Sequence, residues 1–331
     1  MEEPVAVEGL EEPRLRTERA GEVRRVWLEV AGTEGHVCFS DPRADGYAGM
    51  LRDLLGDAAE RGAWLYTPMA LPIAEALDPT VLVYDVMDDL ASFKGAPAQL
   101  TLRQRQALKR VDVVFTGGRS LQRAIVQRRP KETHCFPSGV DPAHYAPAAS
   151  LRSPGPRPVA GYVGVIDERL DVSLMRGLAA ALPEWEIRMV GPISEKLGRA
   201  NAPSAPNILY TGQQPYERLP EILGEFDVAL MPFALNEATR SISPTKTLEY
   251  LAAGLPVVST RVPDVVADYA GIVEFADDGE SFAAACLRAL RRDRADWDAR
   301  VAPLLRRHAW DAIAARMDAI VEEAGGRGRG W

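Results

Sequence analysis

Residues 240–260 read RSISPTKTLEYLAAGLPVVST, and this stretch decides the fold class of the region around it. Ser243 suits a helix N-cap, Pro244 suits the first helical position, and Gly254 suits the residue that ends the helix. Pro256 then turns the chain into the apolar strand that follows. A helix that leads through a glycine into a buried strand predicts an α/β unit with parallel strands.

The first turn of this helix carries the chemistry. The free N–H groups around residues 243–246 (Ser243, Pro244, Thr245, Lys246) and the positive end of the helix dipole suit a phosphate, to which Lys246 adds a full charge. Glu249 lies one turn deeper on the same face and suits a vicinal diol such as a ribose. A phosphate site one turn from a diol site indicates a nucleotide sugar or a related nucleotide. A capped surface helix with solvated Lys246 and Glu249 fits the same pattern.

Short apolar strands alternate with amphipathic helices along most of the chain, which predicts parallel sheets flanked by helices. Residues 146–158, APAASLRSPGPRP, contain four prolines and have the composition of a linker. We therefore expect an α/β protein of two doubly wound Rossmann-like domains that face a cleft. The expected parts are an acceptor-side domain over 1–150, a donor-binding domain over 151–307, a helix over 308–324 that packs back onto the first domain, and a disordered tail over 325–331.

Composition excludes several classes of protein. The chain has 331 residues and a net charge of −8, which argues against a general nucleic-acid binder. Its three cysteines, Cys38, Cys135 and Cys286, form no CxxC pair, which argues against a zinc ribbon and fits a reducing cytoplasm. No histidine pair has metal-ligand spacing, and no apolar run approaches the ~20 residues of a membrane span. We expect a cytoplasmic protein without a bound metal and without a nucleic-acid partner.

The stretch at 240–260 resembles the donor-binding motif of GT-B glycosyltransferases of the glycosyltransferase 4/group 1 type, P-x-K-x-x-E-x-(M/L)-A-x-G-x-P-V-V. The matching residues are Pro244, Lys246, Glu249, Ala252, Gly254, Pro256, Val257 and Val258. Residues 159–171 resemble the first strand and glycine loop of the donor domain, and residues 137–145 (PSGVDPAHY) resemble the element that closes the acceptor domain. Residues 81–93 resemble acceptor-domain strands of a subgroup near teichuronic-acid and exopolysaccharide glycosyltransferases.

The resemblance implies transfer of a sugar from a nucleotide-diphosphate sugar, with a UDP-sugar favoured, to a sugar or lipid-linked hydroxyl acceptor. It implies retention of configuration, no metal, no cofactor beyond the donor itself, and a role in cell-surface polysaccharide or glycolipid synthesis. Besides the helix residues, it implies donor contacts from Gly164, Val165, Arg169, Asn236, Glu237 and Arg240.

Two departures from the family pattern stand out. Relatives often carry a second glutamate eight residues before Glu249, but that position here is Ser241, and the nearest acid upstream is Glu237. Relatives also open with a strand and a glycine-rich loop, whereas residues 1–25 are an acidic, arginine-bearing lead without such a strand. We expect the first domain to be shortened or replaced at its N-terminus.

Three carboxylates lie at the end of the apolar strand predicted over 81–85 and just after it, namely Asp85, Asp88 and Asp89. The carboxyl ends of strands face the ligand cleft in doubly wound domains, and neighbouring carboxylates raise one another's pKa. Asp88 and Asp89, with Lys246, are therefore our candidate catalytic residues. Simple loop capping and solvation explain the aspartates equally well.

Residues 100–131 carry nine Lys and Arg against one acid. Each basic residue near an anionic membrane contributes about 1 kcal/mol, so this stretch predicts peripheral attachment to the inner face of a membrane. A solvated basic face is the alternative.

Two other classes of function stay open. A nucleotide-sugar-binding protein or partner subunit without transferase activity is favoured by Ser241 and by the unusual N-terminus. A Rossmann oxidoreductase would need G-x-G-x-x-G after a strand, and Gly161-Tyr162-Val163-Gly164 is not that pattern.

Overall fold

The computed structural model describes residues 1–33, 35–57, 61–88, 90, 98–128, 132–152, 155–236, 239 and 242–327. The chain divides into two compact units. Unit 1 comprises residues 1–117, 121–135 and 318–331, and unit 2 comprises residues 118–120 and 136–317. The domain boundaries expected near residues 150 and 307 remain predictions. No described helix is long and apolar enough to cross a membrane.

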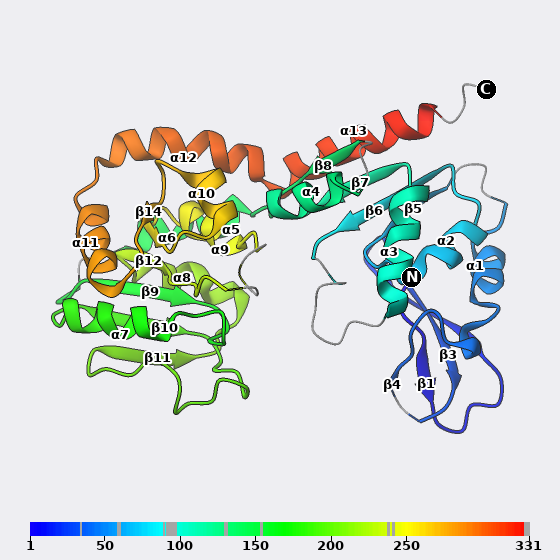
Figure 1. Cartoon of the computed structure of the whole chain (residues 1–331), viewed down its shortest axis with the longest axis horizontal. Helices are drawn as coiled ribbons and strands as arrows, with labels where there is room; N and C mark the ends of the chain where they lie inside the picture. Colours follow the sequence, from blue (N-terminus) through cyan, green and yellow to red (C-terminus); the bar gives the residue numbers. More distant parts are fainter. Residues whose placement is uncertain are drawn as a thin grey trace. The chain divides into compact units, whose positions relative to one another are not determined.

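A four-stranded parallel sheet forms the centre of unit 1, in the order β5-β6-β7-β8 (Figure 1). Every residue of β6 and β7 is buried, as expected for parallel strands covered on both faces. The strands are β5 (Gly62–Leu65), β6 (Val81–Val86), β7 (Val113–Thr116) and β8 (Thr133–Cys135). The helices of the region are η1 (Pro42–Ala44), α1 (Tyr47–Leu55), η2 (Pro68–Ala70), α2 (Leu71–Ala76), α3 (Ala98–Arg110) and α4 (Arg119–Val126).

The N-terminal segment forms a second, smaller sheet in the order β2-β3-β1-β4, from β1 (Val5–Val7), β2 (Arg14–Ala20), β3 (Val23–Ala31) and β4 (Gly35–His36). The expectation of a strandless lead over residues 1–25 is therefore wrong. The edge strand β2 is almost wholly exposed and polar, so it lacks the apolar signal of a buried strand. Gly21, with φ +63°, occupies the first position of the two-residue turn that joins β2 to β3.

Unit 2 is built on a six-stranded parallel sheet in the order β11-β10-β9-β12-β13-β14 (Figure 1). Numbered 1 to 6 in chain order, these strands follow the order 3-2-1-4-5-6 of a dinucleotide-binding domain, with its switch point between β9 and β12. The strands are β9 (Val159–Val163), β10 (Glu186–Val190), β11 (Ile208–Gly212), β12 (Val228–Met231), β13 (Val257–Ser259) and β14 (Glu274–Phe275).

Two apolar cores cover the two faces of this sheet. Strand β12 shows the division, because Val228 and Leu230 join one core while Ala229 and Met231 join the other. The first core is closed by α7 (Val172–Ala181) and α11 (Gly279–Leu290), where burial of a side chain such as Phe282 contributes about 1.5–3 kcal/mol. The second is closed by α8 (Leu219–Gly224), α9 (Thr245–Ala252), α10 (Pro263–Tyr269) and α12 (Arg294–His308).

The expected linker and C-terminal helix differ from the structure. Residues Pro147–Leu151 form helix α6, which follows α5 (Pro142–Tyr145), and Ala148 is fully buried against α8. This part of the proline-rich segment is therefore a packed helix. Pro147 is compatible with it because it occupies the first helical turn, where a backbone N–H has no partner within the helix. The helix expected over 308–324 is α13 (Trp310–Arg327), which begins two residues later and includes Gly325 and Gly326 of the expected tail.

Candidate functional site

The carboxyl end of β9 makes an abrupt turn at Gly164, whose φ of +149° disfavours other residues. The hydroxyl of Tyr250, on α9, accepts a hydrogen bond from the Val163 N–H at 2.8 Å and so anchors the end of the strand. Gly191 follows the neighbouring strand β10, and a Cβ there would lie 2.0 Å from the Gly164 carbonyl oxygen. The two glycines let the backbone segments after β9 and β10 approach closely at the switch point of the sheet.

Helix α9 begins one residue later than expected, at Thr245, and Pro244 occupies the N-cap position. The prediction that Ser243 is the N-cap is wrong, because Pro244 has an extended backbone and no side chain caps the helix. Instead, the Ser243 carbonyl accepts a hydrogen bond from the Ser138 hydroxyl at 3.1 Å. With no capping side chain, the first N–H groups of α9 stay available, as an anion site at a helix N-terminus requires.

Lys246, in the first turn of α9, extends over Gly164. A Cβ at Gly164 would lie 2.3 Å from Lys246 Cε and 2.9 Å from Nζ. The ammonium also lies 6.0 Å from the centroid of the Tyr162 ring, at the distance of a weak cation–π contact. Burial lowers the pKa of Lys246, while the nearby charge of Glu249 opposes that shift. The helix terminus, the glycine turn and the ammonium thus meet at one point, and the donor contacts expected of Lys246 and Gly164 stay a prediction.

Glu249 lies one turn further along α9 and is half-buried. Burial raises the pKa of its carboxyl group, and the charge of Lys246 opposes this most strongly. The charge of Glu249 in turn helps to raise the pKa of Tyr145, after the larger effect of burial. Tyr145 is 1% exposed, and hydrogen bonding by its hydroxyl is one of the effects that lower the pKa of Glu249. Glu249 is therefore a carboxylate held in a poorly solvated place beside the Tyr145 hydroxyl.

An aromatic group borders Tyr145. The ring of His144 stacks on that of Tyr216, with centroids 4.1 Å apart and planes 4° apart. Tyr145 meets both rings edge-on. His144 is also one of the charges that lower the pKa of Glu249, although burial dominates that pKa. These ring contacts hold α5 against the short 3-10 helix η4 (Tyr216–Arg218), which precedes α8.

Arg169 follows the glycine turn, but its guanidinium is already engaged. It forms a bidentate ion pair with Asp167, at 2.6 Å for the shortest contact, and its side chain is 44% exposed. The loop after β12 packs along the same segment, since the Ala234 N–H donates to the Arg169 carbonyl at 2.8 Å. Asn236 lies in this loop, and its side-chain amide donates to the Glu168 carbonyl at 3.4 Å. Of the other residues predicted for this loop, Glu237 and Arg240 lie outside the described residues, as does Ser241.

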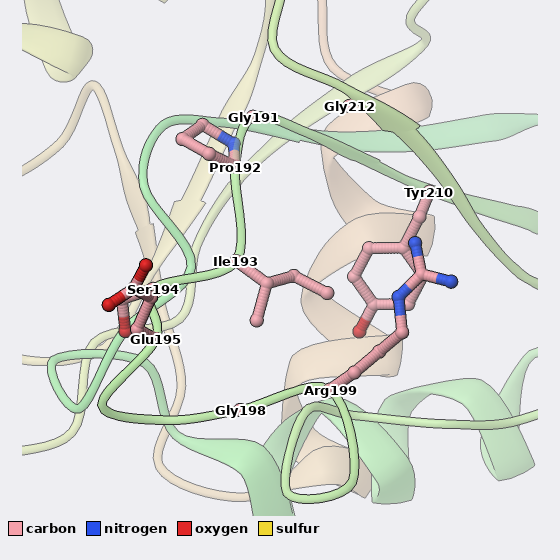
Figure 2. Close-up of a pocket in the computed structure, with 9 residues that line it drawn as sticks. All are labelled: Gly191, Pro192, Ile193, Ser194, Glu195, Gly198, Arg199, Tyr210 and Gly212. Carbon is pink, nitrogen blue, oxygen red and sulfur yellow. The ribbon is translucent and has the colours of Figure 1, made fainter.

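A pocket of about 370 Å³ opens at the carboxyl ends of β10 and β11. Figure 2 shows Ser194 and Glu195 on one side of it, Arg199 and Tyr210 on the other, and Ile193 between them. The Tyr210 hydroxyl donates to the Pro203 carbonyl at 2.5 Å. The lining residues are Gly191, Pro192, Ile193, Ser194, Glu195, Gly198, Arg199, Tyr210 and Gly212. Because Gly191 also contacts Gly164, the pocket adjoins the glycine turn.

The acidic residues predicted for the first domain follow β6, in unit 1. Asp88 is exposed, and partial burial of its carboxyl group raises its pKa. Asp89 lies outside the described residues. Asp85 is only 5% exposed, and burial raises the pKa of its carboxyl group, opposed by a hydrogen bond from Trp64. The described part of the chain holds no group of three or more His, Cys, Asp or Glu residues arranged for a metal.

The basic residues of 100–131 lie on several elements, mainly α3 and α4. Some have acidic partners: Arg110 pairs with Glu75 at 2.6 Å, and Arg119 pairs with Asp268. Arg129 and Lys131 lie outside the described residues. The predicted membrane contact stays a prediction.

Sequence reasoning missed three tyrosines that shape the site, Tyr145, Tyr162 and Tyr250. Tyr250 directly follows Glu249, and Tyr162 lies two residues before Gly164, so both lie inside the segments that resemble the donor domain. Their roles depend on contacts between segments far apart in sequence, which local spacing does not reveal.

Comparisons with known proteins find similar sequences in the region that contains this site. The family model described as glycosyl transferases group 1 matches residues 157–292. The chain is 27% identical over 162 residues to the putative teichuronic acid biosynthesis glycosyltransferase TuaH of Bacillus subtilis, a match that covers 47% of this chain and 38% of that protein. It is 28% identical over 194 residues to the GDP-mannose-dependent alpha-mannosyltransferase of Mycobacterium tuberculosis, covering 55% of this chain and 48% of that protein. These matches span less than half the length of each curated relative.

The fold extends the likeness to most of the chain. The crystal structure of Anabaena HepE in complex with UDP and glucose matches 90% of this chain and 86% of its own, with a TM-score of 0.66 and 14% identity. The likeness confirms the expected α/β fold with parallel sheets. Residues 157–292 therefore match the model of glycosyl transferases group 1, and the chain has the fold of GT-B glycosyltransferases.

Proposed function

We propose that this protein transfers a sugar from a nucleotide-diphosphate sugar to a hydroxyl acceptor. One observation carries the proposal: Lys246 extends over the Gly164 turn at the uncapped start of α9, with Glu249 one turn away. The family match over residues 157–292 supports a nucleotide sugar as the ligand of this region.

In this proposal the donor diphosphate binds at the N-terminus of α9. The N–H groups of Thr245 and Lys246, together with the backbone after Gly164, would donate hydrogen bonds to it, and the Lys246 ammonium would neutralise its charge. Val165, which is 41% exposed and follows the turn, would border the same group. As the bond to the sugar breaks, negative charge grows on the leaving diphosphate, so these donors stabilise the transition state more than the ground state.

Glu249 would accept hydrogen bonds from the ribose hydroxyls. Its position three residues after Lys246 separates the diol site from the phosphate site by about 4.5 Å along the helix. The pocket beside Gly191 would then receive the nucleoside, because it adjoins the glycine turn. The HepE complex with UDP favours a UDP-sugar, while the mannosyltransferase relative names GDP-mannose as its donor.

The finer features of the reaction rest on the family resemblance. We propose that the transfer retains the anomeric configuration, as the resemblance implies. We also propose that it needs no metal, because Lys246 and the helix terminus can neutralise the leaving diphosphate. The acceptor would be a sugar or a lipid-linked sugar of a cell-surface polysaccharide, as the name of TuaH suggests. A cytoplasmic protein attached to the membrane through its basic stretch would meet such an acceptor.

Release of nucleoside diphosphate tests the proposal without knowledge of the acceptor, because glycosyltransferases also transfer the sugar slowly to water. The full chain is incubated with UDP-glucose or GDP-mannose in the presence of EDTA, and the released nucleotide is measured by chromatography. We expect release from one donor, and its loss in Lys246→Met. Tight nucleotide binding without any release would favour the alternative of a binding subunit.

A further inference from the structure

The sheet register of unit 1 gathers polar and aromatic side chains on one face, near the carboxyl ends of β5 and β6. Trp64 is paired with Val83, and Asp85 lies two residues beyond Val83 on the same side of β6. Asp85 is in turn paired with Phe115 on β7. The alternate residues of these strands, such as Leu65 and Tyr84, belong to the apolar core on the opposite face, so this assignment of faces is consistent with burial.

Two aromatic side chains, one on this face and one just after the end of β5, reach solvent. Trp64 stacks on the fully buried Phe115, with ring centroids 5.2 Å apart, and yet Trp64 remains 38% exposed. Tyr66, two residues further along, is 65% exposed. Phe115 thus supports the Trp64 ring from inside, which leaves a fixed indole and a neighbouring phenol at the surface.

A buried carboxylate lies beside these rings. The Trp64 indole donates a hydrogen bond to Asp85 Oδ2 at 3.3 Å, and the charge of Asp85 helps to raise the pKa of Tyr66, after the larger effect of burial. Asp85 is 5% exposed, and no described residue forms an ion pair with it. A carboxylate accepts several hydrogen bonds, so one long indole bond leaves Asp85 with acceptor capacity to spare.

These features describe the binding chemistry of a sugar ring. A pyranose presents C–H groups on its face, which suit an aromatic ring, and hydroxyl groups at its edge, which suit a carboxylate acceptor. An anionic ligand would be repelled by Asp85, and an acyl chain would leave Asp85 without a hydrogen-bond donor. The site lies at the carboxyl ends of parallel strands, where ligands of α/β sheets bind.

We propose that Trp64, Tyr66 and Asp85 form a binding site for a neutral saccharide, which is the acceptor of the reaction. This assignment names the acceptor class and thus rests on the proposed function. Trp64 and Tyr66 contact the face of the sugar ring, and Asp85 accepts a hydrogen bond from one of its hydroxyls. The Trp64–Asp85 hydrogen bond fixes the orientation of the indole ring and of the carboxylate before the sugar binds.

Saturation-transfer NMR on the full chain tests the site, with methyl glycosides of glucose, galactose, mannose and N-acetylglucosamine as probes at millimolar concentration. The variants are Tyr66→Ala, Trp64→Phe and Asp85→Asn. Tyr66→Ala removes a largely exposed side chain and is expected to fold even if a change at Trp64 perturbs the sheet. Trp310→Phe is the matched control, because Trp310 is similarly exposed at 49% and lies in unit 2.

We expect at least one glycoside to bind the wild type, and Tyr66→Ala and Asp85→Asn each to weaken it about tenfold, the effect of ~1.4 kcal/mol. Trp310→Phe should bind as the wild type does. Binding of no glycoside, or equal binding by all variants, would overturn the assignment. Calorimetry with UDP and GDP on the same samples separates the two proposals. Loss of nucleotide binding alone counts against the proposed function, whereas intact nucleotide binding without glycoside binding counts against the saccharide site.

Discussion

The side chain of Lys246 occupies the space that a β-carbon at Gly164 would need, with Cε only 2.3 Å from that position. The segments that contain Gly164 and Lys246 lie more than eighty residues apart in sequence, and their close packing requires glycine at position 164. The ammonium therefore lies against the turn at the end of β9, in the space that the absent side chain of Gly164 leaves free. This fit places a positive charge at the switch point of the sheet.

Gly164→Ala is expected to destabilise the protein and to weaken nucleotide binding. The alanine would adopt an unfavourable φ, at a cost of about 1–3 kcal/mol, and would displace Lys246. Chemical denaturation and calorimetry with UDP measure the two effects. Gly21→Ala is the control, since Gly21 also has a positive φ but has open space around it. Equal nucleotide affinity in Gly164→Ala and wild type would show that the position of Lys246 does not matter.

Lys246→Met should lower the affinity for a nucleoside diphosphate by about 10- to 100-fold, as expected for the loss of a charged hydrogen bond worth ~1.5–3 kcal/mol. The same variant should be more stable without ligand. Burial lowers the pKa of Lys246, so the unfolded state binds its proton more tightly, and wild-type stability rises with pH between the folded and unfolded pKa values. Lys246→Met lacks this rise. Lys109→Met, on an exposed part of α3, serves as the control in both measurements.

The pH dependence of donor binding should report on Glu249. Burial raises the pKa of this carboxyl group, so protonation begins at a higher pH than for an ordinary glutamate. We expect the affinity for UDP-glucose to fall as the pH decreases towards this raised pKa, because the protonated acid is a weaker acceptor for the ribose hydroxyls. UDP-glucose is the suitable probe, since its diphosphate does not titrate in this range. Glu249→Gln should bind more weakly at neutral pH and show a flatter profile, and a parallel profile would contradict the role of Glu249.

The Tyr250 hydroxyl anchors the end of β9 and should contribute measurably to stability. It accepts a hydrogen bond from the Val163 N–H, so Tyr250→Phe leaves that donor unpaired and should lower the free energy of unfolding by about 1–3 kcal/mol. Urea denaturation of wild type and Tyr250→Phe measures this loss. An unchanged free energy of unfolding would contradict the anchoring role of the hydroxyl.

The parts of the fold that the sequence predicts best are buried parallel strands. Strands β9, β10 and β12 show the reason, because each is a short run rich in apolar residues that is followed directly by a glycine or a proline. Strand β2 was not predicted because its residues are exposed and mostly charged, so they do not form the apolar pattern by which a buried strand is identified. The helical segment Pro147–Leu151 was missed because its prolines suggested a linker, although one of them starts a helix.

The site was predictable where it depends on spacing along one helix. Lys246 and Glu249 share a face because they are three residues apart in α9, and local sequence contains that information. The closeness of Tyr145 to Glu249 and the close approach of Gly191 to Gly164 depend on packing between segments far apart in sequence. The cap was predicted wrongly because Ser243 has the right residue type, but the backbone of Pro244 moves the helix start by one residue.

The central claim is that the start of α9 binds a nucleotide through Lys246 and Glu249. Titration calorimetry of the full chain with UDP and GDP, in EDTA, tests it most directly when wild type and Glu249→Ala are compared. The account predicts that one nucleotide binds the wild type with one-to-one stoichiometry, and that Glu249→Ala binds it at least about tenfold more weakly, a loss of ~1.4 kcal/mol or more. Binding of equal strength in both proteins, or no binding of either nucleotide to the wild type, would contradict it.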